Sequence, residues 1–276
     1  MEEIVIEAGT ADRHYWKDIW NYREVLYFLA WRDVVIRYKQ TVVGFLWTFI
    51  RPVLTMLILV FVFRKISGLT SGSTPYPVMV FAGVLPWMLF SSALNGGGAS
   101  LLGNSNLISK VYIPRLIIPT STMAVCLVEF AISLLFLMVI MAWYLVAPTW
   151  RIITLPFWTA LALLAAFGPA ILIGALNVRY RDFNQILPFL IQIGTYVTPV
   201  GFRTEFVMQR ISEPWRTLYA LNPMVGVIDG FRWAICGADF HIDWFRFATS
   251  CITTLVLLCI GISYFRRVEK TFADAI

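Results

Sequence analysis

Charged residues are scarce in this sequence. Asp, Glu, Lys and Arg make up 14% of the 276 residues, whereas residues with apolar side chains make up 59%. Ordinary soluble domains carry about 25% charged and about 45–50% apolar residues. A soluble globule of this composition would lack the surface charge that keeps it in solution, and a disordered chain would be far less apolar. The composition therefore predicts an integral membrane protein, with enough length for about six spans of roughly 20 residues each.

Motifs for metal, redox and nucleotide chemistry are missing as well. The four cysteines include no Cys-x-x-Cys pair, and the only histidines are His14 and His241. No Lys follows a Gly, so the chain has no Walker A loop, and it has no Gly-x-Ser-x-Gly or His-Glu-x-x-His motif. We therefore expect no enzyme, no metal, no cofactor and no nucleic-acid partner. Energy, if it is used, must come from a partner chain.

Six charge-poor runs are long enough to cross a bilayer as helices. They cover residues 44–63, 77–102, 118–146, 152–178, 183–202 and 247–265. The sequence predicts an all-α membrane protein with a six-span domain over 44–265. The segment 1–43 before it and the tail 266–276 after it are predicted to be cytoplasmic. Three consecutive glycines at 96–98 are expected to let another helix approach closely.

The positive charges predict the orientation. The termini and the even-numbered loops hold 13 Lys and Arg, whereas the two short opposite loops, 64–76 and 147–151, hold three. Five more lie in the long segment 203–246. Because cytoplasmic loops are enriched in Lys and Arg, both termini are placed in the cytoplasm, with basic residues at lipid headgroups.

The segment 203–246 contains an apolar stretch that could pass for a seventh span. It is interrupted by Asn222 and Pro223 and carries Asp229 and Arg232. Proline removes a backbone donor and Asn-Pro favours a turn. We predict a re-entrant pair of short helices on the external side that forms a gate. Asp229 and Arg232, three residues apart, are expected to pair with each other.

The residues before the first span carry charges of both signs and many aromatic side chains. Trp20, Tyr27, Trp31 and Tyr38 fall on one helical stripe within residues 18–40. Since Trp and Tyr prefer headgroup depth, we predict an amphipathic helix lying in the cytoplasmic interface.

Five motifs, in this order, resemble the permease subunits of polysaccharide-exporting ABC transporters of the O-antigen and teichoic-acid type. They are Arg37-Tyr38-Lys39 with Gly44-Phe45-Leu46-Trp47 and Arg51-Pro52; Phe81-Ala82-Gly83-Val84-Leu85-Pro86-Trp87; Leu107-Ile108-Ser109-Lys110-Val111-Tyr112-Ile113-Pro114-Arg115; Tyr180-Arg181-Asp182-Phe183 with Tyr196-Val197-Thr198-Pro199; and Leu221-Asn222-Pro223-Met224 with Gly230-Phe231-Arg232. One departure is Glu129, where many relatives are expected to carry Asp.

The resemblance implies a homodimer of six-span subunits with two copies of a separate ATP-hydrolysing subunit. It implies a bacterial inner-membrane location and a polysaccharide substrate on a polyprenyl pyrophosphate carrier. It also implies a channel lined by the first and fifth spans, for which Trp47, Phe49, Arg51, Tyr196 and Phe202 are the candidates. Lipid contact or helix packing is the alternative for each aromatic side chain. An exporter of small lipids or drugs, or a membrane enzyme acting on polyprenyl-linked sugars, are the alternative functions.

Arg51 has three possible roles. An arginine inside a span costs at least about 2.5 kcal/mol unless it is paired or hydrated. It can pair with Glu129 of the third span, or it can meet the carrier pyrophosphate, to which its planar fork is suited. Snorkelling to the interface is the third possibility.

The loop between the second and third spans is predicted to contact the ATPase subunit. Leu107, Ile108 and Val111 are spaced for one helical face and lie outside the bilayer core, so they need a protein surface to cover them. Lys110, Tyr112 and Arg115 accompany them. An ordinary loop resting on headgroups is the alternative.

Overall fold

The computed structural model describes residues 15–39, 44–111, 113–180, 182–269 and 272. Within this part of the chain the regular structure is helical and contains no strand. In chain order the helices are α1 (Tyr15–Asn21), α2 (Arg23–Lys39), α3 (Gly44–Leu59), η1 (Val60–Ile66), α4 (Tyr76–Gly103), α5 (Ser105–Lys110), α6 (Ile117–Trp143), η2 (Trp150–Thr154), α7 (Leu155–Arg179), α8 (Phe183–Val197), α9 (Thr204–Met208), α10 (Glu213–Ala220), α11 (Pro223–Cys236), η3 (Gly237–Asp239) and α12 (Trp244–Val268).

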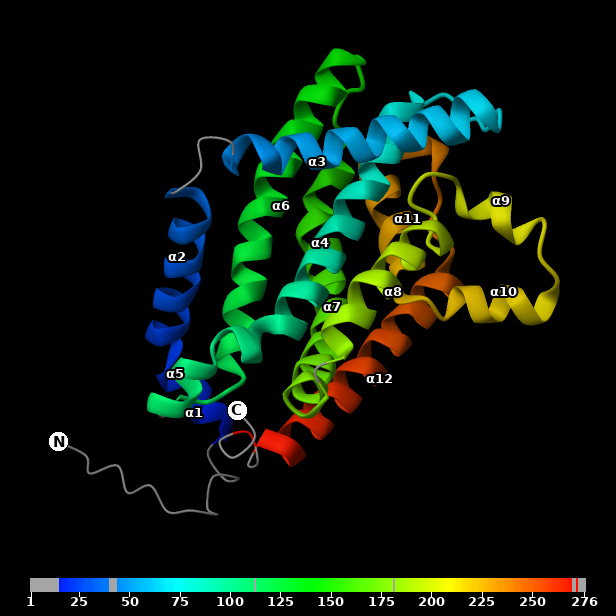
Figure 1. Ribbon diagram of the computed structural model, residues 1–276. Coiled ribbons are helices and arrows are strands. Elements are labelled where there is room, and N and C mark those ends of the chain that lie inside the picture. The colour runs from blue at the N-terminus through cyan, green and yellow to red at the C-terminus, as the bar shows by residue number, and fades with distance from the viewer. Residues whose placement is uncertain (1–14, 40–43, 112, 181, 270–271, 273–276) are drawn as a thin grey trace.

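The long helices α4, α6, α7 and α12 run side by side as a bundle (Figure 1). α4 is the central helix, since it packs against α6, α7 and α11 and most of its side chains are buried. Hydropathy predicts these four helices within a few residues of their observed ends. Their apolar character around the whole circumference is what a buried or lipid-facing helix requires.

Glycines allow two close helix crossings in this bundle. A Cβ atom on Gly97 of α4 would lie 2.8 Å from Cβ of Ala170, so the predicted close approach at the glycine run is confirmed against α7. A Cβ atom on Gly168 of α7 would lie 2.6 Å from the carbonyl oxygen of Leu257 in α12. Small residues bring helix backbones together in this way in membrane proteins.

α2 stands along α6, and α3 lies across the bundle (Figure 1). α2 buries Leu29 and Ala30, whereas Trp20, Tyr27 and Trp31 of the predicted stripe are exposed. α3 is held through Phe49, whose ring centroid lies 6.0 Å from that of Phe136. The aromatic stripe predicts a helix within residues 18–40 and hydropathy predicts one over 44–63, but neither pattern carries information on helix direction. The interfacial location of α2 therefore stays a prediction.

The predicted fifth span is shorter than expected. α8 ends at Val197, directly before Thr198 and Pro199, because the residue before a proline is disfavoured in a helix. Five helical stretches in the described residues are long and apolar enough to cross a membrane, namely Leu46–Ile66, Tyr76–Gly103, Ile117–Trp143, Trp150–Arg179 and Trp244–Val268. α8 is not among them, so the six-span count stays a prediction.

The two described ends of the chain lie at the same end of the bundle, which we call the terminal end (Figure 1). The guanidinium of Arg266 in α12 lies 5.1 Å from the ring centroid of Tyr15 in α1. α5 lies at this end too, whereas η1, η2 and η3 lie toward the opposite, far end. An even number of crossings is consistent with this arrangement.

Candidate functional site

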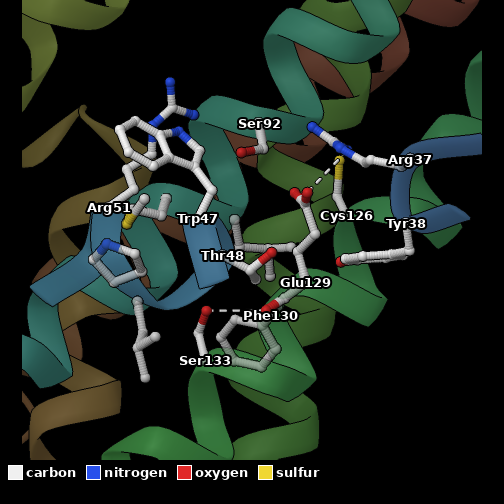
Figure 2. A pocket seen from close by; sticks show the side chains of 14 residues that line it. Arg37, Tyr38, Trp47, Thr48, Arg51, Ser92, Cys126, Glu129, Phe130 and Ser133 are labelled. Carbon is white, nitrogen blue, oxygen red and sulfur yellow. Dashed lines mark hydrogen bonds and ion pairs between the residues drawn. The ribbon is translucent and has the colours of Figure 1, made fainter. Parts of the chain in front are cut away.

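A cavity of about 380 Å³ lies between α2, α3, α4 and α6 (Figure 2). Its charged side chains are Arg37 of α2, Arg51 of α3 and Glu129 of α6. With both arginines and the glutamate ionised, these three groups carry a formal charge of +1. Apolar and aromatic side chains make most of the remaining wall, with hydroxyl groups between them; the lining includes Tyr38, Trp47, Thr48, Pro52, Leu85, Met88, Ser92, Phe130 and Ser133.

Glu129 is ion-paired with Arg37. Nη1 of Arg37 lies 3.0 Å from Oε1 of Glu129, and the two side chains point toward each other in Figure 2. Pairing with Glu129 was one of the three roles expected for Arg51, and that expectation is wrong, since Arg37 forms the ion pair. α2 runs along α6 and brings the end of α2 to the middle of α6, which places Arg37 nearer than Arg51. Arg37 belongs to the Arg37-Tyr38-Lys39 motif, which was the signal that could have identified it.

Arg51 lies in the same cavity with an exposed side chain. It follows Trp47 by four residues on α3, so the two side chains lie on one face of that helix. Trp47 is 54% exposed and also lines the cavity. The arrangement offers a guanidinium and an indole beside an ion pair that is already neutral. Such a set can bind an anion that carries an apolar or sugar portion.

The other predicted channel residues lie outside this cavity. Phe49 packs against Phe136, and Phe202 is buried, with its ring centroid 5.3 Å from that of Phe63. Tyr196, on α8, is 65% exposed. The structure thus brings Trp47 and Arg51 together and places Tyr196 and Phe202 elsewhere.

The predicted gate segment contains a deeply buried arginine. The guanidinium of Arg232 in α11 is 0% exposed and donates hydrogen bonds to three carbonyl oxygens. These belong to Val200 at 2.8 Å, Phe202 at 2.8 Å and Met79 at 3.3 Å. A Cβ atom on Gly83 would lie 2.7 Å from Nη2 of Arg232, so α4 needs a glycine there. Arg232 therefore joins α11 and α4 to the turn after α8.

Asp229 does not form the expected pair with Arg232. It accepts a hydrogen bond of 2.6 Å from the hydroxyl of Thr204, and its Oδ2 atom lies 3.8 Å from Nε of Arg246 in α12. The local pair fails because the Arg232 side chain is directed to the carbonyl oxygens of the turn. Sequence spacing alone cannot show such a non-local partner.

Asn222 is the N-cap of α11. Its side-chain oxygen accepts a hydrogen bond of 3.0 Å from the backbone N–H of Met224, and Pro223 occupies the first turn. Its amide group donates to the hydroxyl of Thr198 at 2.9 Å, which fixes the start of α11 beside the end of α8. α11 is then buried against α4, α7 and α12, while α9 and α10 extend away from the bundle (Figure 1).

The predicted ATPase-contact loop forms α5 at the terminal end, and Tyr112 lies outside the described residues. Ile108 is half-buried against a cluster that includes Leu101 and Phe265, so it faces the helix bundle of its own chain. Val111 is 50% exposed and Lys110 is exposed. Only part of the predicted apolar face is therefore open to a partner.

A polar junction at the far end has no signature in the sequence, because its two sides are more than 160 positions apart. The carboxylate of Asp239 accepts hydrogen bonds from the hydroxyl of Ser73 at 2.7 Å and from the backbone N–H of Thr74 at 2.6 Å. The hydroxyl of Thr74 donates to it as well. The hydrogen bonds from Thr74 and Ser73 hold the pKa of Asp239 below its usual range. This junction ties the loop after η1 to η3.

Comparisons with known proteins identify relatives over most of the chain. Residues 24–236 match the family described as ABC-2 type transporter. An O-antigen export system permease protein, RfbA, from Myxococcus xanthus is 28% identical over 260 residues, which is 94% of this chain and 98% of that protein. A protein of the same name from Klebsiella pneumoniae is 24% identical over 255 residues, or 91% and 94% of the two chains. The polysialic acid transport protein KpsM from Escherichia coli is 22% identical over 241 residues, or 87% and 91%.

Proposed function

Because the chain belongs to the ABC-2 type transporter family, we propose that it is the membrane subunit of an ATP-driven polysaccharide exporter. The substrate in this proposal is an O-antigen-like polymer on a polyprenyl pyrophosphate carrier. The proposed location of the protein is the bacterial inner membrane, with both termini in the cytoplasm. A separate subunit, present in two copies, hydrolyses ATP.

One observation supports polysaccharide as the substrate class, and another supports a separate ATPase subunit. The relatives named above export O-antigen or transport polysialic acid, and they align with the chain along nearly their full length. The sequence has no Walker A loop of its own, which agrees with a partner that supplies ATP hydrolysis.

The observation that carries the proposal is the position of Arg51 beside Trp47 in the cavity. The carboxylate of Glu129 is engaged by Arg37, so Arg51 is the cation with which an incoming phosphate would interact. Guanidinium forks match phosphate oxygens, and sugar C–H faces pack against aromatic rings. A cavity of about 380 Å³ is at the small end of ligand sites, and it suits a head group rather than a whole polymer.

A homodimer is the remaining part of the proposal. α3 and η1 expose a row of large apolar side chains that lipid or a second copy must cover, namely Leu46, Trp47, Leu54, Leu57 and Ile58 of α3 and Phe61 of η1. α8 also exposes Phe189, Ile193 and Tyr196. α12 and part of α6 expose apolar side chains as well, including Ile252, Leu255 and Leu135. Placing the dimer interface along the first and fifth predicted spans is therefore part of our proposal, and lipid would cover the remaining open faces.

The proposal can be tested in cells that synthesise a lipid-linked glycan but lack their own exporter. Co-expression of this chain with its ATPase subunit should deliver the glycan to the cell surface, where an antibody detects it. Arg51→Gln should reduce surface glycan at least about tenfold at unchanged permease level, whereas Arg64→Gln, outside the cavity near the end of η1, should not. Equal surface glycan for Arg51→Gln and wild type would remove Arg51 from the proposal. Absence of surface glycan with the wild-type pair would contradict the export function.

A further inference from the structure

The segment 104–115, which connects α4 to α6, is held at both of its ends by residues from the two ends of the chain. At its start, Nη2 of Arg32 in α2 donates a hydrogen bond of 3.1 Å to the side-chain oxygen of Asn104. The amide of Asn104 donates in turn to the carbonyl oxygen of Ser100 at 2.9 Å. Asp33 lies 2.7 Å from Nη2 of Arg32 and orients it. These contacts fix where α4 ends and α5 begins.

At the end of the segment, the carboxylate of Glu269 holds the backbone. The N–H of Arg115 donates a hydrogen bond of 3.2 Å to Oε1 of Glu269, one residue beyond α12. Phe272 is 0% exposed, and its ring centroid lies 5.5 Å from that of Phe265. The guanidinium of Arg115 lies 5.7 Å from the ring centroid of Phe272. Phe272 is therefore packed against Phe265 and Arg115.

α1 completes the contact at Glu269. The hydroxyl of Tyr15 is buried beside the Glu269 carboxyl, and burial raises the pKa values of both groups. The hydrogen bond from Arg115 and the positive charges of Arg115 and Arg266 act in the opposite direction on Glu269. Removing a carboxyl group from water costs free energy, and the hydrogen bond from the Arg115 N–H offsets part of this cost. The contact between Glu269 and the backbone of Arg115 is therefore a structural one.

The middle of the segment is anchored too, since Ile108 is half-buried against the cluster formed by the ends of α4, α7 and α12. Val111 and Lys110, by contrast, stay exposed. The segment is thus fixed at three points, and its exposed residues, among those described, are Asn106, Ser109, Lys110 and Val111. A connector resting only on lipid headgroups needs no such set of tertiary contacts.

One helix joins this segment to the cavity. Arg32 and Arg37 are five residues apart on α2, which corresponds to about 7.5 Å along the helix axis. Arg32 contacts Asn104, and Arg37 contacts Glu129 in the cavity wall. A displacement of the segment that moved Arg32 would move Arg37 with it, because both belong to the same continuous helix.

We propose that Arg32 and Glu269 are positioning residues that clamp the segment 104–115, and that α2 links this segment to the Arg37–Glu129 pair. The inference rests on the proposed function, because it takes 104–115 as the contact for the ATPase subunit. It adds that the end of the chain and α2 set how ATP hydrolysis is coupled to transport.

The test uses the permease in complex with its ATPase subunit. Hydrogen–deuterium exchange of the peptide that contains Arg115 should accelerate about tenfold in Glu269→Ala, since a charged hydrogen bond to that backbone is lost. Glu269→Gln keeps an acceptor oxygen and should exchange like wild type. Arg32→Ala should accelerate the peptide that contains Asn104, whereas Arg23→Ala, at the exposed start of α2, should not.

The second measurement is the amount of ATP hydrolysed per glycan exported. Glu269→Ala and Arg32→Ala should each raise this ratio severalfold, and the two control variants should leave it unchanged. Unchanged exchange in both alanine variants would overturn the clamp. Faster exchange with an unchanged ratio would overturn the link to coupling, while export by the wild-type complex would still support the proposed function. If Glu269→Ala fails to fold, Arg32→Ala tests the other end of the clamp independently.

Discussion

The guanidinium of Arg37 and the carboxylate of Glu129 meet at 3.0 Å and join the last turn of α2 to the middle of α6. This contact neutralises the carboxylate on the inner face of the cavity. The net charge of the cavity lining is therefore the positive charge of the second arginine, Arg51. The same ion pair is one of the contacts between α2 and α6.

Arg37 and Glu129 are expected to be energetically coupled. Arg37→Gln and Glu129→Gln should each lower the melting temperature of the purified permease, and the double variant should lower it by less than the sum. Because the Arg37 side chain is 51% exposed, we expect a coupling free energy of only about 1 kcal/mol. Arg51→Gln combined with Glu129→Gln is the matched control and should be additive. Coupling in the control but not in the test pair would restore the Arg51–Glu129 pairing.

Arg232 should be among the least replaceable residues. Arg232→Met removes the donors to Val200, Phe202 and Met79 and leaves buried carbonyl oxygens without partners. We expect a loss of about 3 kcal/mol or more, seen as a lower yield and melting temperature of the monodisperse protein. Arg210→Met, which removes an arginine stacked on Phe206, should cost under about 1 kcal/mol. Similar losses for the two variants would show that the three carbonyl contacts contribute little.

The far-end junction is expected to open in acid. The pKa of Asp239 is lowered in the folded protein, so its carboxylate stabilises the junction at pH values above the ordinary pKa of an aspartate. This contribution is lost as the pH falls through the lowered folded-state pKa. Protection of the Thr74 amide, corrected for the intrinsic pH dependence of exchange, should therefore fall below about pH 4.

Asp239→Asn is the control for this pH dependence. The asparagine has no carboxyl group to titrate, so the protection of Thr74 should be weaker at neutral pH and flat through the acid range. A wild-type junction that keeps its protection to pH 2 would contradict the role of the Asp239 charge.

The outer surface of 104–115 should bind the ATPase subunit through Val111 and Lys110. Val111→Asp places a charge on an exposed apolar position, so the permease should keep its melting temperature but lose the ATPase subunit on co-purification. Ile153→Asp, at an exposed apolar position in η2 on the opposite end, should keep the partner. Retention of the partner by Val111→Asp would leave the segment as an ordinary interfacial loop.

Ile108→Asp should behave differently from Val111→Asp. Ile108 is half-buried in the terminal-end cluster, so the charge would destabilise the permease itself. A melting temperature lowered in Ile108→Asp and unchanged in Val111→Asp would separate the inner face of the segment from its outer face.

The sequence predicts the long helices well because hydropathy depends on side chains that are local in the chain. The run 77–102, for example, corresponds to α4 at Tyr76–Gly103. The Asn222 cap was predictable for the same reason, since capping involves a residue two positions away. The direction of α3 was not predictable, because it depends on which distant side chains, such as Phe136, its few covered residues meet.

Site residues followed the same rule. Arg51, Trp47 and Glu129 were recognised as unusual from their own positions, and they do line one cavity. Their pairing was not recognised, because Arg37 reaches Glu129 only through the packing of α2 on α6. Arg232 likewise finds its partners in the turn after α8, far from it in sequence.

The central claim is ATP-driven export of a glycan on a polyprenyl pyrophosphate carrier, and transport into inverted membrane vesicles tests it most directly. Vesicles would contain the permease and its ATPase subunit, and the glycan added to their cytoplasmic face would be followed by its protection from an external glycosidase. The account predicts that protection rises with ATP, requires both subunits and is lost when the pyrophosphate is removed from the carrier. Transport of small lipids or drugs by the same vesicles, with no protection of the glycan, would contradict it.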